Sequence, residues 1–149
     1  MAAFDAALFD AGIANYNLIR LSSIIPQGFE PKKEKINWNG YEAGKVPGEF
    51  GDKLYVVYAS QIENEMGKEA WAGIGWVMAE DGSKKGLFTE HEAHSKAEVE
   101  NLIHETLSSM VKYRKEKYGP VQMEVVGITC ESKPVCALVA AVYKTESWN

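Results

Sequence analysis

One long amphipathic helix, set among several strand-like segments, constrains the fold of this chain most strongly. Ser95 and Glu98 have the spacing of a capping box, which predicts a helix start at this point. Apolar residues then recur at helical spacing as far as Tyr113, and Gly119-Pro120 ends the pattern. Four basic residues are expected in the last turn, where they complement the helix dipole: Lys112, Arg114, Lys115 and Lys117.

The segments on either side of this helix favour strands. Extended structure is predicted for residues 17–26, 54–62, 70–79, 86–93, 121–129 and 135–143. A short helix is predicted over 4–14, and a loop with room for one short strand over 27–53. Because strands and helices do not alternate regularly, a doubly wound parallel sheet is disfavoured. The pattern predicts an α/β sandwich of the αββα type with mainly antiparallel strands.

Length and composition restrict the function only broadly. The 149 residues are expected to form a single domain, 1–149, with a substantial core. The net charge of −5 argues against a nucleic-acid partner. The chain has neither an apolar run long enough to span a membrane nor a basic leader, so we expect no membrane association and a cytoplasmic location.

The polar cluster before the long helix is the first candidate metal site. It contains His91 and His94 with Glu90 and Glu92, all of them metal-ligating residue types. On a strand, however, Glu90 and His91 point to opposite faces. We therefore expect solvated polar side chains here and no metal.

Two other patterns suggest binding chemistry only weakly. Cys130 and Cys136 flank a predicted turn, but no basic residue is placed to lower their pKa values, so buried thiols are favoured. Gly73 and Gly75 form a G-x-G that lacks the third glycine of a dinucleotide site. Their small size instead favours close packing of another element on the strand.

A pair of serines, Ser22-Ser23, interrupts an apolar segment that ends at Pro26. Small polar residues in a half-buried strand are costly unless their hydroxyls are hydrogen-bonded. On the residues alone, bonding of both hydroxyls to local backbone is the favoured interpretation.

The segment around the serine pair resembles the N-terminal part of pyruvoyl-dependent arginine decarboxylases. Residues 3–26 contain, in order, A-F-D, A-G-I, N-x-N-L-I-R and S-S-I followed by a proline. VPGE at 46–49, GLFTEHEAHSKAEVE at 86–100 and CALVAAVY at 136–143 are similar to later segments of the same family. The resemblance covers most of the chain.

The resemblance implies a self-cleaving proenzyme. The Oγ of Ser23 attacks the carbonyl carbon of Ser22, and β-elimination then separates residues 1–22, the β chain, from residues 23–149, the α chain. The dehydroalanine left at residue 23 hydrolyses to a covalent pyruvoyl group with loss of ammonia. The reaction requires a hydroxyl on the downstream residue and a backbone that presents it.

The resemblance also implies the reaction and its proton donor. The pyruvoyl ketone forms a Schiff base with L-arginine, the neighbouring amide carbonyl accepts the electron pair left by CO₂, and agmatine is the product. Glu90 is expected to protonate the α-carbon, with Glu92 as its rival on the same strand face. Two alternatives stay open: decarboxylation of another amino acid, and an uncleaved, non-catalytic assembly subunit of the same fold.

Two further residues and an assembly follow from the resemblance. Asn17 matches a family asparagine that positions the Ser22 carbonyl or the substrate, and Asp5 matches an aspartate that faces the substrate guanidinium. Family members form trimers, in some cases paired into hexamers, with active sites between subunits.

Overall fold

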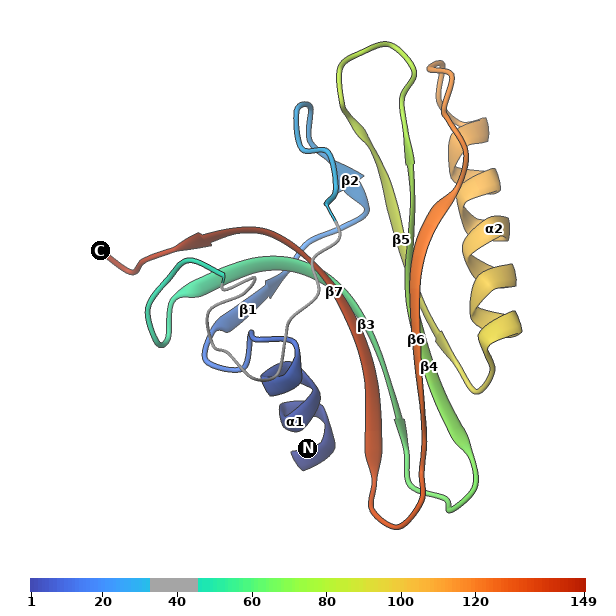
Figure 1. Ribbon diagram of the computed structural model, residues 1–149. Coiled ribbons are helices and arrows are strands. Elements are labelled where there is room, and N and C mark those ends of the chain that lie inside the picture. The colour runs from blue at the N-terminus through green and yellow to red at the C-terminus, as the bar shows by residue number, and fades with distance from the viewer. Residues whose placement is uncertain (33–45) are drawn as a thin grey trace.

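The protein folds into four layers in the order helix, sheet, sheet, helix, as a computed structural model describes for residues 1–32 and 46–149 (Figure 1). This architecture confirms the predicted αββα sandwich, and the middle of the predicted 27–53 loop lies outside the described residues. In chain order the elements are α1 (Ala2–Asp10), β1 (Asn17–Arg20), β2 (Ile24–Ile25), β3 (Lys53–Glu63), β4 (Glu69–Met78), β5 (Gly86–Ala93), α2 (Lys96–Lys112), β6 (Gln122–Thr129) and β7 (Val135–Glu146).

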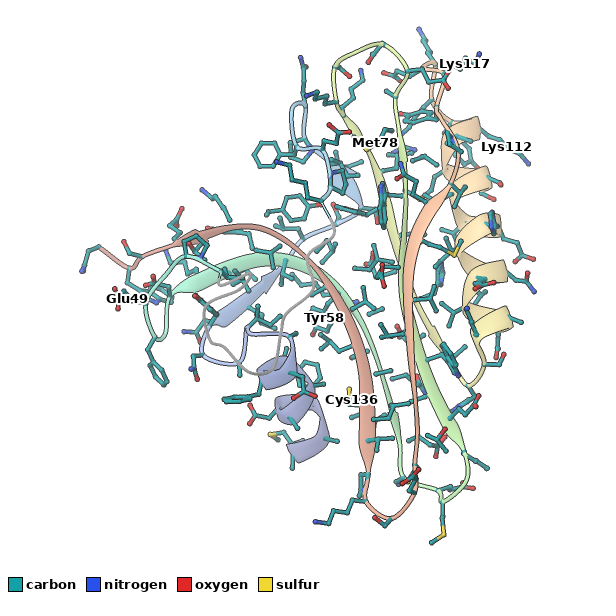
Figure 2. The ribbon with its side chains drawn as sticks, in the orientation of Figure 1. Glu49, Tyr58, Met78, Lys112, Lys117 and Cys136 are labelled. Atoms are coloured by element: carbon teal, nitrogen blue, oxygen red, sulfur yellow. The ribbon has the colours of Figure 1, made fainter. Side chains whose placement is uncertain are left out.

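The two sheets exchange strands along the chain. One has the order β1-β3-β7 and the other β2-β5-β4-β6, and every described pairing is antiparallel except that of β1 with β3. The connections β1–β2, β3–β4 and β6–β7 therefore each pass from one sheet to the other. Side chains from both sheets fill the space between them (Figure 2), with Trp76, Phe88 and Val139 in the buried cluster.

Helix α2 covers the outer face of the β2-β5-β4-β6 sheet. Gly73 and Gly75 lie under it, and a Cβ added at Gly75 would overlap the side chain of Ile103. The prediction that these glycines allow a second element to pack closely is therefore confirmed. Shape complementarity of this kind keeps a two-layer contact free of voids.

The start of α2 is as predicted, and its end is not. The Ser95 Oγ accepts a hydrogen bond from the Glu98 N–H at 3.2 Å. The helix ends at Lys112, so the prediction that Arg114, Lys115 and Lys117 lie in its last turn is wrong. The segment after the helix is bonded instead to the end of β4, because the Lys117 carbonyl accepts from the Glu80 N–H at 2.8 Å. Helix α1 likewise ends at Asp10, earlier than predicted.

The predicted extended segment at 17–26 is divided between the two sheets. Its first part is β1, paired with β3, and its last part is β2, paired with β5. Pro26 has no N–H to donate and so limits β2 to two residues. The Ser22-Ser23 pair therefore lies in the crossing between sheets, not within a strand.

No helix among the described residues is long and apolar enough to cross a membrane.

Candidate active site

The crossing that contains the serine pair is anchored at both ends by backbone hydrogen bonds. On the side of the β1-β3-β7 sheet, the Leu21 N–H donates to the Val56 carbonyl at 2.8 Å. On the side of the other sheet, the Ser23 carbonyl accepts from the Phe88 N–H, also at 2.8 Å. The Ser22–Ser23 peptide bond thus joins the two sheets, with Ser22 exposed and Ser23 half-buried.

Glu90 brings a carboxyl group to the same region. It follows Phe88 by two residues on β5, so both side chains point toward the opposite sheet. Among the described residues, its Oε2 is buried without a hydrogen-bond partner, and its Oε1 lies 4.0 Å from the Arg20 Nη2. Burial raises the pKa of Glu90 because it penalises the charged form, and this effect outweighs the nearby Arg20 charge, which lowers the pKa.

Glu92, the predicted rival of Glu90, is in a different environment. It lies two residues further along β5, opposite Ala72 of β4, and is exposed. Water surrounds its carboxyl group, whereas a carboxyl that donates a proton at neutral pH needs an apolar setting. The geometry therefore favours Glu90 for the role.

Arg20 is a neighbour that the residue patterns did not single out. Its guanidinium lies 4.5 Å from the centre of the Tyr58 ring and donates from Nη2 to the Tyr58 carbonyl at 2.8 Å. These contacts hold the cation at the end of β1, beside Glu90. Its place in the N-L-I-R run just before the serine pair was the available signal.

Tyr143 was also missed, because an aromatic residue near the end of a strand is usually part of the core. Its hydroxyl donates to the Ile24 carbonyl at 2.9 Å, one residue beyond the serine pair. Its ring packs edge-on against Phe88, with 6.1 Å between ring centres. Burial, and secondarily the charge of Glu90, raise the pKa of Tyr143 to about 12, so the hydroxyl remains a donor at neutral pH.

Asp5 and Asn17 lie apart from this cluster within one chain. Asn17 begins β1, and its Nδ2 donates to the Gly51 carbonyl at 2.6 Å. It lies at the far end of β1 from the crossing, five residues before Ser22. Asp5 is exposed on α1, which packs on the outer face of the β1-β3-β7 sheet. The contacts of the described residues join neither side chain to Glu90.

The histidines and cysteines have other surroundings. The Nε2 of His91 lies 2.8 Å from the Thr106 Oγ1 of α2, on the opposite face of β5 from Glu90, as predicted. His94 is exposed and lies 3.1 Å from the Glu63 carboxylate. No group of three or more potential ligands in the described part of the chain is placed to hold a metal ion. Cys130 is buried, and burial raises the pKa of the Cys136 thiol, which disfavours its reactive thiolate form.

The fold and this cluster define an αββα sandwich whose sheet-to-sheet crossing carries a serine pair beside a half-buried carboxyl group. A pyruvoyl group at residue 23 would fit this position, because Ser23 is held at the crossing and the nearby Glu90 Oε2 is buried without a hydrogen-bond partner in the described part of the chain.

Comparison with known proteins identifies the family. Residues 1–148 match the family model of pyruvoyl-dependent arginine decarboxylase. A protein of that name from Thermococcus sibiricus is 33% identical over 141 residues, which cover 94% of this chain and 83% of the relative. Another from Methanococcus vannielii is 35% identical over 143 residues, covering 93% and 78% respectively. A third, from Pyrococcus horikoshii, is 31% identical over 141 residues, covering 94% and 83%. The chain belongs to the pyruvoyl-dependent arginine decarboxylase family.

Proposed function

We propose that this protein decarboxylates L-arginine to agmatine and CO₂ with a pyruvoyl group made from Ser23. The observation that carries the proposal is Glu90 Oε2, a buried carboxyl oxygen without a hydrogen-bond partner among the described residues. It lies two residues along β5 from the backbone N–H that holds Ser23. A native protein rarely leaves such an atom without a partner, and a substrate that needs a proton there explains it. Family membership supplies the reaction class.

Self-cleavage would proceed at the crossing between the sheets. The Ser23 Oγ attacks the Ser22 carbonyl carbon, the peptide C–N bond breaks, and the hydroxyl proton passes to the released amino group. The α-proton of residue 23 is then removed and the Ser22 carboxylate leaves, which frees residues 1–22. Water hydrolyses the remaining dehydroalanine, through its imine form, to ammonia and the new N-terminal group of residues 23–149.

The pyruvoyl group supplies a ketone that holds the substrate amine and a carbonyl that takes up the electrons left by CO₂. The chain's own contribution is a proton held in the right place. Because burial raises the pKa of Glu90, a larger fraction of this carboxyl group carries a proton at a given pH than of an exposed glutamate. Glu90 then delivers that proton to the substrate α-carbon, and Arg20 stays beside it through its contacts with Tyr58.

We further propose that the active site is completed by a second copy of the chain in a trimer or hexamer. Asp5 is exposed on α1 and remote from Glu90 within one chain, which suits a residue that acts on a neighbour's substrate. A carboxylate can pair with a guanidinium through two parallel hydrogen bonds. Asn17, exposed at the start of β1, is proposed to position the substrate or a Ser22 carbonyl across the same interface. The net charge of −5 suits a cationic substrate.

Intact-mass analysis of the purified protein tests the proposal. We expect a fragment ending at Ser22 and a larger one that begins with pyruvoyl, and Ser23→Ala should give an intact chain without activity. Release of CO₂ is then measured with arginine, ornithine, lysine and histidine, and arginine should be the preferred substrate. An intact wild-type chain would point to a non-catalytic subunit, and preference for another amino acid would reassign the substrate.

A further inference from the structure

Two successive carbonyl groups on the downstream side of the proposed cleavage site are hydrogen-bonded. The Phe88 N–H holds the Ser23 carbonyl at 2.8 Å, and the Tyr143 hydroxyl holds the Ile24 carbonyl at 2.9 Å. The first donor belongs to β5 in one sheet, and the second to β7 in the other. The start of β2 is therefore fixed by both layers of the sandwich.

An irregularity in β7 places the Tyr143 side chain. Val142 lies opposite Val56, but the next aligned pair is Lys144 with Tyr55, so Tyr143 is an extra residue in the ladder. Bulges of this kind redirect a side chain and are frequent beside active sites. Here the ring of Tyr143 packs on Phe88 and joins the cluster between the sheets.

We propose that Tyr143 is a positioning residue for self-cleavage, because its hydroxyl fixes the backbone immediately downstream of Ser23. This inference rests on the proposed cleavage between Ser22 and Ser23. A peptide group is planar, so bonds to two successive carbonyls fix two successive peptide planes. Ser23 is then left with the rotations about its N–Cα and Cα–C bonds and its side-chain rotamer as the main freedoms. The Leu21 anchor on the other side of the crossing restricts the two backbone rotations.

The expected consequence concerns the first chemical step. An Oγ atom attacks a neighbouring carbonyl carbon efficiently only when the two are held close and aligned. Without the Tyr143 hydroxyl, the Ile24 peptide plane can rotate, and Ser23 spends less time in the reactive arrangement. Ester formation at Ser23 should therefore slow, while the packing of the ring on Phe88 is retained in Tyr143→Phe.

The test follows the conversion of newly made full-length chain into the fragment 23–149 over time, on denaturing gels and by intact mass, after cell-free synthesis. Tyr143→Phe should slow this conversion by about fivefold, the effect expected from one hydrogen bond. Tyr16→Phe is the matched control, because the Tyr16 hydroxyl also donates to a backbone carbonyl, that of Val46, at 2.8 Å. It should cleave at the wild-type rate.

Two further measurements separate positioning from a general loss of structure. Replacement of Tyr143 by 4-aminophenylalanine retains a donor and should restore cleavage, whereas the near-isosteric 4-fluorophenylalanine should not. Hydroxylamine, which cuts esters, should not accelerate breakdown of the Tyr143→Phe precursor, because the ester forms slowly in this variant.

Four outcomes would overturn the role of Tyr143. They are wild-type cleavage of Tyr143→Phe, equal slowing in Tyr16→Phe, equal rates for the two phenylalanine analogues, and rapid hydroxylamine cleavage of the stalled precursor. In each of these the proposed function survives, provided that the wild-type chain cleaves. A wild-type chain that never cleaves would overturn both proposals.

Discussion

The two faces of β5 each partly bury a titratable side chain, Glu90 on one and His91 on the other, but they differ in the hydrogen bonds that they offer. His91 faces α2, and its Nε2 lies 3.1 Å from the Thr89 Oγ1 and 2.8 Å from the Thr106 Oγ1. Glu90 faces the other sheet, where its Oε2 is buried without a hydrogen-bond partner among the described residues. Burial acts on both groups in the same sense, because it favours their neutral forms and so lowers the pKa of His91 and raises the pKa of Glu90.

The difference between the faces is whether the neutral group is satisfied. A buried polar group that has its hydrogen bonds contributes to a stable packing arrangement, and one that lacks them costs free energy. The α2 face is therefore structural, whereas on the inter-sheet face one carboxyl oxygen, Glu90 Oε2, has no hydrogen-bond partner among the described residues. A site for proton transfer to a substrate has this character, because its partner arrives only with the substrate.

The largest expected effect comes from replacing the Glu90 carboxyl group. Glu90→Gln should cleave normally but reduce kcat by about 100-fold or more, the usual contribution of a positioned general acid. The amide resembles the protonated carboxyl in shape, so the fold should be retained. The measurements are intact mass for cleavage and CO₂ release from arginine for turnover.

His91→Gln is the matched control, since it introduces the same side chain at the adjacent residue on the other face. A glutamine amide can still bond to the hydroxyls of Thr89 and Thr106, so kcat should stay near the wild-type value. Equal losses of turnover in the two variants would remove the functional distinction between the faces. Full activity in Glu90→Gln would transfer the proton donor elsewhere, first to Glu92.

The regular elements around this strand were predictable because their patterns are local. Residues 86–93 were predicted to be extended, and β5 has these bounds. The α2 face followed from apolar spacing, and Val99, Ile103 and Leu107 are its buried residues. In such elements the spacing of the apolar residues matches the buried face, so a single sequence is enough to predict the element.

The features that shape the candidate site depend on contacts distant in sequence. Nothing in residues 17–26 alone indicates that the chain changes sheets at Ser22, because the anchors are Val56 and Phe88. The Tyr143 bond to Ile24 joins residues at the two ends of the chain and depends on a register shift in β7. The roles of the serine pair and Glu90 came from family resemblance, since residue patterns alone favoured ordinary polar residues.

The second largest effect tests the packing on the α2 face. In Gly75→Ala the added methyl would overlap the Ile103 side chain, and we expect a loss of about 2 kcal/mol in unfolding free energy, as in other overpacked cores. Turnover per folded molecule should be unchanged.

Gly119→Ala is the control, since the nearest atom to its added Cβ is the Met78 carbonyl oxygen at 3.6 Å, an ordinary contact. Denaturant titration measures the unfolding free energy, and CO₂ release per folded molecule measures the activity. Similar losses of stability in both variants would contradict close packing at Gly75.

The smallest effect is a pH dependence of stability with opposite signs on the two faces. The pKa of Glu90 is raised above its usual 4.5, so the folded state keeps this proton to higher pH than the unfolded chain does. Stability from Glu90 is therefore present at low pH and lost as pH rises from 4.5 through the raised folded value. The pKa of His91 is lowered from its usual 6.5, so the unfolded chain takes up this proton first as pH falls. Stability from neutral His91 is present above pH 6.5 and lost as pH falls toward the lower folded value.

Thermal midpoints of the wild type and the two glutamine variants, measured across pH at fixed protein concentration, show these signs directly. The wild type should lose stability relative to Glu90→Gln as pH rises, and relative to His91→Gln as pH falls. Arg20 and Glu92 are the charged groups that act on Glu90, one lowering and one raising its pKa, and Glu92 also acts on His91. Because burial is the largest cause of both pKa shifts, neither charged neighbour reverses the expected change of stability with pH. If the two stability differences changed in the same direction with pH, the inference that burial favours the neutral forms of both Glu90 and His91 would be contradicted.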